Sequence, residues 1–73
     1  MACVDMIATG QRIHDLRIKA GMTIKNIQDA CGITATSVCN WQNGKSVPSV
    51  DNLVILAALW HVGLDDIIVT CTV

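Results

Sequence analysis

Glycine and proline interrupt this chain at short intervals, and the intervals limit the length of any regular element. The interrupting positions are Gly10, Gly21, Gly32, Gly44, Pro48 and Gly63. Each interval fits a short helix. A chain of 73 residues is expected to form one domain, residues 1–73, that buries only roughly 60% of its unfolded surface. We therefore expect a domain of short helices that has no room for a deep substrate cleft between two lobes.

Apolar residues recur at helical spacing within these intervals, which predicts five helices. The first helix is expected between Thr9 and Gly21, and the last is a short turn after Gly63. Thr23, Thr34 and Ser49 precede the second, third and fourth helices, and their hydroxyl groups suit the N-cap position. The expected inward residues, helix by helix, are Ile13, Leu16 and Ala20; Ile24, Ile27 and Cys31; Val38 and Trp41; Leu53, Leu56, Ala57 and Trp60; and Ile67. The predicted fold class is all-α, with a core at about residues 10–68.

The terminal segments, residues 1–8 and 69–73, are rich in apolar and β-branched residues. Two interpretations of them remain open. Chain ends are often loosely ordered, with a few side chains covering the core. Alternatively, the alternation in Thr70-Cys71-Thr72-Val73 suits a short strand, paired either within the chain or across a dimer.

Catalytic, metal and membrane sites are not expected. The carboxylates and the two histidines are scattered, and no acid–base or nucleophile–base pair can be assigned. The four cysteines include no Cys-x-x-Cys pair, so we expect no metal, no cofactor and free thiols in a reducing compartment. The apolar run from Leu53 to Trp60 is far shorter than the roughly 20 residues of a membrane-spanning helix. The first residues also lack the pattern of a signal peptide, so we expect a cytoplasmic protein.

The charge distribution gives no simple argument for nucleic-acid binding. The formal net charge is −1 and the pI is about 6.0, whereas nucleic-acid-binding domains are usually strongly basic. Residues 1–25 hold four of the five basic residues, and residues 34–43 contain no charged residue. Any prediction of DNA binding must therefore come from the spacing of residues.

The spacing between residues 27 and 41 is typical of a helix-turn-helix unit. In such a unit the helices are held together by apolar residues at fixed positions, and glycine supplies the left-handed turn residue. The positions that match are Ile27, Cys31, Gly32, Ile33, Val38 and Trp41.

Further stretches extend this match from Gly10 to Ile68. They are Arg12-Ile13-His14-Asp15-Leu16-Arg17, Gly21-Met22-Thr23, Cys31-Gly32-Ile33-Thr34, Val38-Cys39-Asn40-Trp41-Gln42-Asn43-Gly44-Lys45, Pro48-Ser49, Asp51-Asn52-Leu53 and Val62-Gly63-Leu64-Asp65-Asp66-Ile67. In this order, the chain resembles the phage-repressor and Cro-like (XRE-type) helix-turn-helix family, in particular its small bacterial members. The resemblance implies a five-helix domain whose third helix, residues 34–42, enters the major groove of DNA.

The resemblance also implies which residues contact DNA. Thr34, Ala35, Thr36 and Asn40 would face base edges, and Thr23, Ser37, Asn43 and Lys45 would lie near phosphates. Their chemistry suits these roles, because asparagine can bind adenine through two hydrogen bonds, hydroxyl groups serve many acceptors, and methyl groups can touch the methyl group of thymine. The alternative is an ordinary solvated helix face.

The chain departs from the family pattern at two informative positions. Ile24 stands where the family often has a glutamine that holds a phosphate. Gln42 stands where many members have an acidic residue that pairs with the arginine matched by Arg17, so we expect a neutral-to-charged hydrogen bond here.

Homodimerisation would double the few phosphate contacts available to one copy. The candidate interface residues are Ile55, Trp60, Ile68 and Val69, and the alternative is that they complete a small core. We therefore predict a regulator that binds double-stranded DNA as a homodimer and represses transcription by occupying an operator. The alternative function is a protein-interaction module built on the same fold.

Overall fold

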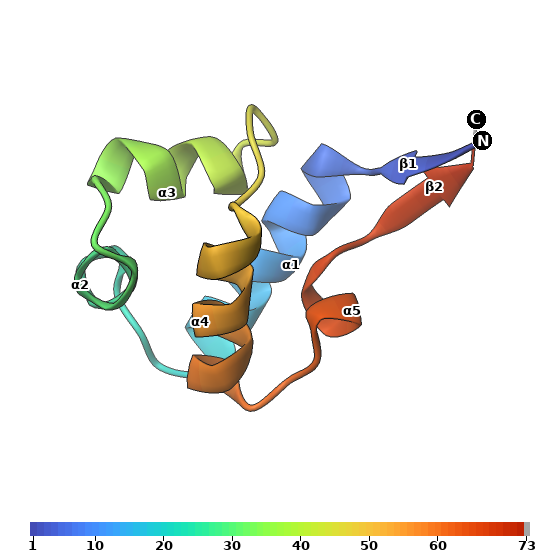
Figure 1. Ribbon diagram of the computed structural model, residues 1–73. Coiled ribbons are helices and arrows are strands. Elements are labelled where there is room, and N and C mark those ends of the chain that lie inside the picture. Colours follow the sequence, from blue (N-terminus) through green and yellow to red (C-terminus); the bar gives the residue numbers. More distant parts are fainter. Residues whose placement is uncertain (73) are drawn as a thin grey trace.

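Five helices and a two-stranded sheet make up the structure, a computed structural model that describes residues 1–72. The helices are α1 (Met6–Lys19), α2 (Ile24–Cys31), α3 (Ala35–Gln42), α4 (Val50–Trp60) and α5 (Leu64–Ile67), and the strands are β1 (Ala2–Val4) and β2 (Thr70–Thr72). In Figure 1, α3 lies across one end of α1 and α4, while the strands project from the other side of the molecule. The predicted all-α class with strand-like termini is confirmed.

The predicted N-caps all form, because each needs only its own sequence neighbours. The hydroxyl groups of Thr23, Thr34 and Ser49 accept from the backbone N–H groups of Asn26, Ser37 and Asn52 at 3.2, 3.2 and 3.3 Å.

The beginning of α1 was predicted too late in the chain. The helix begins at Met6 rather than after Thr9, because Asp5 caps it by accepting from the N–H of Ala8 at 2.9 Å. Gly10, expected to interrupt the chain, therefore lies inside α1.

The core lies between α1, α2, α3 and α4, and α5 covers one end of it. Its buried apolar side chains are Ile13, Ile27, Val38, Trp41, Leu53, Leu56, Trp60 and Ile67. Leu16, Ile24, Cys31 and Ala57, also predicted to face inward, are half-buried against this cluster. Ala20 is exposed, contrary to the prediction, because it is the C-cap residue and lies beyond the last helical turn of α1.

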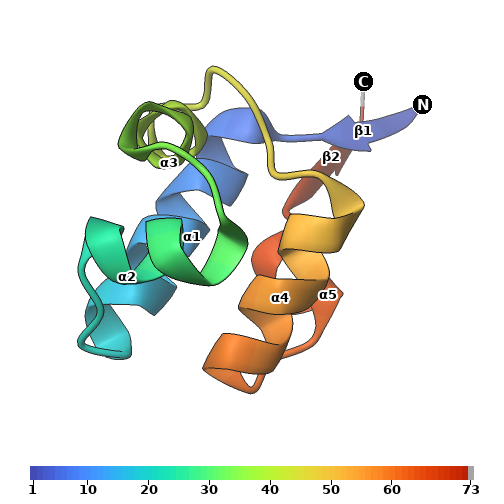
Figure 2. The same cartoon turned by 60° about the vertical axis from the view of Figure 1, so that its left-hand side comes forward.

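The two termini pair with each other within one chain (Figures 1 and 2). The strands are antiparallel, with Cys3 opposite Cys71 in the register. Beyond the strands, the N–H of Asp5 donates to the carbonyl of Val69 at 2.8 Å. The buried hydroxyl group of Thr9 accepts from the Val69 N–H at 2.9 Å and donates to the Val69 carbonyl at 3.3 Å. Of the two interpretations of the termini, the structure therefore confirms the strand pair, formed within one chain.

Across residues 1–72, none of the helices has the length and apolar character required to cross a membrane.

Candidate nucleic-acid interface

The α2–α3 unit has the geometry of a helix-turn-helix. Gly32 ends α2 in the left-handed conformation, with φ 66°, and the N–H groups of Gly32 and Ile33 both donate to the carbonyl of Gln28. In Figure 1, α2 is seen end-on while α3 lies across the view, so the turn changes the chain direction sharply. The predicted role of Gly32 as the left-handed turn residue is confirmed.

The outward face of α3 carries small polar side chains. Thr34, Ala35 and Thr36 are exposed, while Ser37 and Asn40 are half-buried. The hydroxyl groups of Thr34 and Ser37 lie 3.1 Å apart, within hydrogen-bonding distance. The opposite face is in the core, where Val38 is fully buried and Trp41 is 4% exposed. The helix therefore has one anchored face and one face able to donate and accept hydrogen bonds.

A close approach between the backbones of α1 and α3 positions α3. A Cβ atom built on Gly10 would lie 2.0 Å from the carbonyl oxygen of Trp41 and 3.0 Å from that of Gln42. Only glycine permits this separation, so Gly10 sets the distance between α1 and the C-terminal end of α3. In the sequence, Gly10 was noted as a position that interrupts the chain and as the first residue of the family match. Neither observation indicated this contact with α3.

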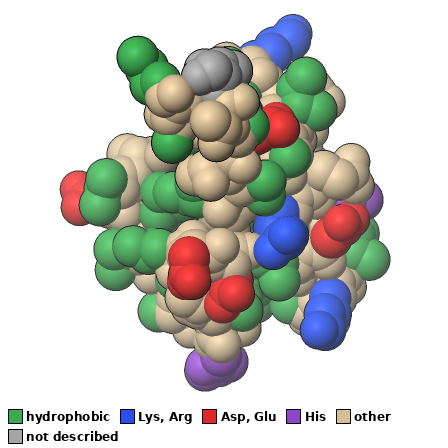
Figure 3. All heavy atoms as spheres, turned by 90° about the vertical axis from the view of Figure 1, so that its right-hand side faces the viewer, with side chains coloured by type: hydrophobic (Ala, Val, Ile, Leu, Met, Phe, Trp, Pro, Cys, Tyr) green, Lys and Arg blue, Asp and Glu red, His purple; other side chains and the backbone are tan. Residues whose placement is uncertain are grey.

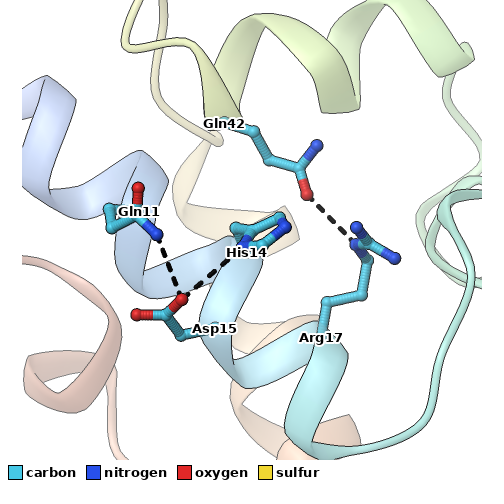
Figure 4. A network of polar contacts seen from close by, with 5 residues as sticks. All are labelled: Gln11, His14, Asp15, Arg17 and Gln42. Atoms are coloured by element: carbon cyan, nitrogen blue, oxygen red, sulfur yellow. Dashed lines mark hydrogen bonds and ion pairs between the residues drawn. The ribbon is translucent and has the colours of Figure 1, made fainter.

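Arg17 of α1 provides a second attachment for α3 (Figure 4). Its Nε donates to Oε1 of Gln42 at 3.1 Å, and its Nη1 donates to the carbonyl of Met22 at 3.0 Å. Asp15 lies on the same helix but accepts from Gln11 at 3.1 Å and lies 3.5 Å from Nδ1 of His14. The predicted bond between Arg17 and the neutral Gln42 is therefore confirmed, and it ties the end of α3 to α1 and to the loop before α2.

Few basic side chains remain available around α3. Lys25 pairs with Asp29 at 3.4 Å, and Arg12 donates to the carbonyl of Asp66 at 2.7 Å. Lys45 is exposed, and within residues 1–72 it forms no ion pair. Its N–H donates to the carbonyl of Asn40 at 2.9 Å, which places Lys45 at the C-terminal end of α3.

The structure gathers most of the predicted contact residues around α3. Thr34, Ala35, Thr36, Ser37 and Asn40 lie at its N-terminus or along it, and Asn43 and Lys45 lie in the turn that follows it. Thr23 instead lies at the start of α2 and is exposed.

Cys31 and Cys39 are both half-buried. Cys39 follows the buried Val38 on α3. Cys31 was expected to be buried and is also half-buried, and its burial raises the pKa of its thiol above the usual 9.0. Residues 1–72 contain no group of three or more side chains able to hold a metal ion.

The candidate dimer residues lie on α4 and around α5. Ile55, Ile68 and Val69 are half-buried, whereas Trp60 is 9% exposed and belongs to the core. Exposed apolar side chains on the same elements are Val50, Val54 and Leu64. Figure 3 shows the face with α5 and the strands, where apolar side chains surround a few carboxylates and basic groups.

Comparisons with known proteins agree with this geometry. The family described as helix-turn-helix matches residues 13–67. Among solved structures, the chain is similar to the restriction-modification controller protein C.AhdI from Aeromonas hydrophila, with a TM-score of 0.76 and 22% sequence identity over 86% of this chain and 96% of that one. No curated protein matches the sequence.

Proposed function

Because the chain belongs to the XRE-type helix-turn-helix family of DNA-binding transcription regulators, we propose that it recognises specific sites in double-stranded DNA with α3 in the major groove. The observation that carries this proposal is the outward face of α3. It presents small hydrogen-bonding side chains on a helix that Gly10 and Arg17 hold in place.

The proposed base contacts are made by Thr34, Ala35, Thr36 and Asn40. Asn40 is suited to adenine, and the methyl groups of Ala35 and Thr36 are suited to thymine. A good two-bond contact discriminates against the wrong base by about 1–3 kcal/mol. The proposed recognition therefore rests on neutral hydrogen bonds and methyl contacts rather than on arginine–guanine pairs.

The proposed phosphate contacts come from Thr23, Ser37, Asn43 and Lys45. Lys45 is the one charged group among these four, and Lys25 is exposed in the first turn of α2. Each phosphate neutralised contributes about −0.9 to the slope of log K against log salt, so one copy with about two or three such contacts has a slope near −2 to −3. A single copy is therefore expected to bind DNA weakly.

We propose that the working unit is a homodimer with two half-sites about one helical turn, or roughly 34 Å, apart. Ile55, Ile68 and Val69 supply its interface, Trp60 contributes only its exposed edge, and Val54 and Leu64 extend the apolar surface. Occupation of such an operator blocks transcription, so repression is the simplest action for the proposed regulator. The protein of similar fold is itself a controller of a restriction-modification system, which is in keeping with a regulatory role.

Selection from a pool of random duplex DNA, with sequencing of the retained molecules and a salt titration, tests the proposal. We expect enrichment of a site with two related half-sites and affinity that falls steeply as salt rises. Asn40→Ala should lower affinity for the selected site by about 5- to 150-fold for each half-site bound and relax the base preference at one position in each half-site, while leaving the salt slope unchanged.

Lys45→Ala should make the salt slope shallower by about 0.9 for each copy, and the matched control Lys45→Arg should retain it. An absence of retention at low salt, or binding that tolerates salt, would contradict DNA recognition. The apolar surface of α4 and α5 would then favour the protein-interaction module.

A further inference from the structure

Two thiols face each other across the terminal strand pair. Cys3 and Cys71 are direct partners in the antiparallel register, although 68 positions separate them in the sequence, and their Sγ atoms lie 3.3 Å apart. Cys3 is exposed and Cys71 is half-buried, so small reagents in solvent can reach the pair. The other two cysteines lie on α2 and α3. The register thus singles out one pair among the four thiols.

The strand geometry suits a covalent bond between these sulfur atoms. Directly opposed residues of antiparallel strands have Cα atoms about 4.5–5.5 Å apart, which falls within the range of about 4.4–6.8 Å found across disulfides. The sulfur atoms must approach by only about 1.2 Å to reach the bond length of about 2.05 Å. Side-chain rotation supplies a movement of this size without displacing the backbone.

We propose that Cys3 and Cys71 are a redox pair that forms a reversible intramolecular disulfide by exchange with small-molecule disulfides of the oxidised glutathione class. In the first step the thiolate of Cys3, the more exposed residue, attacks one sulfur of the small disulfide and releases one small thiolate. In the second step Cys71 loses its proton and its thiolate attacks Sγ of Cys3, which releases the second small thiolate. The two cysteines lose two protons and two electrons, and the small disulfide is reduced to two thiols.

The surroundings of Cys71 favour this order of attack. The hydrogen bond with Cys3 raises the pKa of the Cys71 thiol, and desolvation and the negative charges of Cys3 and Asp5 raise it further. The raised pKa makes the Cys71 thiol a poor attacking group in the first step. Once the Cys3 charge is consumed in the mixed disulfide, the repulsion from that charge disappears and Cys71 can complete the exchange.

The disulfide would fix a part of the fold that otherwise depends on a short ribbon. Each strand has three residues, and an isolated two-stranded ribbon is marginally stable in water. The ribbon continues into the bonds that Asp5 and Thr9 make with Val69, which hold the beginning of α1 against the segment after α5. Oxidation would close a loop that contains nearly the whole chain, so the termini would be fixed when oxidised and free to open when reduced.

Equilibration of the full chain in oxidised and reduced glutathione, followed by alkylation of free thiols and trypsin digestion without reduction, tests the proposal. Cleavage after lysine and arginine leaves Cys3 in residues 1–12, Cys71 in residues 46–73, and Cys31 and Cys39 together in residues 26–45. We expect residues 1–12 linked to residues 46–73, an intact mass that is monomeric and lower by two hydrogen atoms, and alkylated Cys31 and Cys39.

Stability provides the second measurement. Closing a loop of this length should raise the melting temperature by about 10–30 °C in the oxidised protein, and the shift should vanish in Cys3→Ser and in Cys71→Ser. The matched control Cys31→Ser should retain the increase in melting temperature on oxidation. The disulfide should also form at least about 10-fold more favourably in the folded protein than in concentrated urea.

Three results of the peptide and mass analysis would overturn the proposal. They are separate glutathione adducts on Cys3 and Cys71, linkage of either residue to residues 26–45, and a disulfide between two copies. A disulfide that forms equally well in urea would also overturn it, because the strand register would then contribute nothing. Since no readout involves DNA, these outcomes are independent of the proposed DNA recognition.

Discussion

Replacement of Gly10 by alanine tests how closely α1 and α3 approach. The added Cβ atom would lie 2.0 Å from the carbonyl oxygen of Trp41 and 3.0 Å from that of Gln42. Ordinary contacts between such atoms are above about 3 Å, so the helices must separate by roughly 1 Å or more. The obstructing atoms belong to the backbone, and no side-chain rotation can relieve the clash.

Two opposing terms set the size of the effect. Alanine is favoured over glycine within a helix by about 1 kcal/mol. Overpacking costs about 1–3 kcal/mol, and the upper end applies here because the clash is with backbone atoms. The net expectation for Gly10→Ala is a loss of about 2 kcal/mol in the free energy of unfolding. In a domain of this size, that loss corresponds to a melting temperature lower by about 8–16 °C.

Urea denaturation followed by circular dichroism measures this loss, with Gln11→Ala as the control. Gln11 is exposed on the same helix and its bond to Asp15 is on the surface, so this control should change stability by less than about 0.5 kcal/mol. Gly10→Ala should also weaken binding to a selected DNA site in conditions where the variant is folded, because α3 is displaced. A variant as stable as the original chain, or more stable, would refute the close approach.

Two further predictions concern Gln42 and Cys31. Gln42→Glu converts the hydrogen bond from Arg17 into an ion pair, so urea denaturation at pH 7 should show a free energy of unfolding higher by about 0.5–1 kcal/mol. This gain should disappear when the pH falls below the pKa of the new carboxyl group. An unchanged stability at pH 7 would contradict this prediction. Burial raises the pKa of the Cys31 thiol in the folded protein above 9.0, its value in the unfolded chain. The stabilisation that the protonated thiol contributes is therefore complete below pH 9.0 and is lost as the pH rises through the pKa of the folded protein. Denaturation between pH 8 and 10.5 should therefore show a shallower loss of stability in Cys31→Ala than in the original chain, and equal losses would count against it.

Most features that were predicted correctly depend on near neighbours in the sequence. The caps at Thr23, Thr34 and Ser49 each need a hydroxyl group and an N–H three residues later, and all three form. The left-handed turn at Gly32 follows from the residue type and its place after an apolar stripe. The bond between Arg17 and Gln42 joins residues distant in the sequence, and it was predicted only through the family resemblance.

Several features that were missed depend on contacts between distant residues. Gly10 looked like a helix breaker, and the reason that a glycine stands at this position of α1 is the nearby carbonyl of Trp41, which local sequence cannot reveal. The terminal strands had a suitable alternation, but the choice between loose ends and pairing depends on the opposite end of the chain. Cys3 and Cys71 lie opposite each other because of that register, and their positions in the sequence gave no indication of it.

The low charge of α3 bears directly on how the proposed recognition would achieve specificity. Non-specific binding to DNA comes almost entirely from cation–phosphate contacts, whereas base contacts act only at the correct site. If α3 reads DNA as proposed, the net charge of −1 and the absence of charge on α3 lower the non-specific affinity, whereas the proposed base contacts of Thr34, Thr36 and Asn40 are not weakened. Each proposed base contact then supplies a larger share of the total binding free energy than it would in a strongly basic domain. The low charge also supports the proposed homodimer, because one copy has too few cations near α3 to bind tightly at physiological salt.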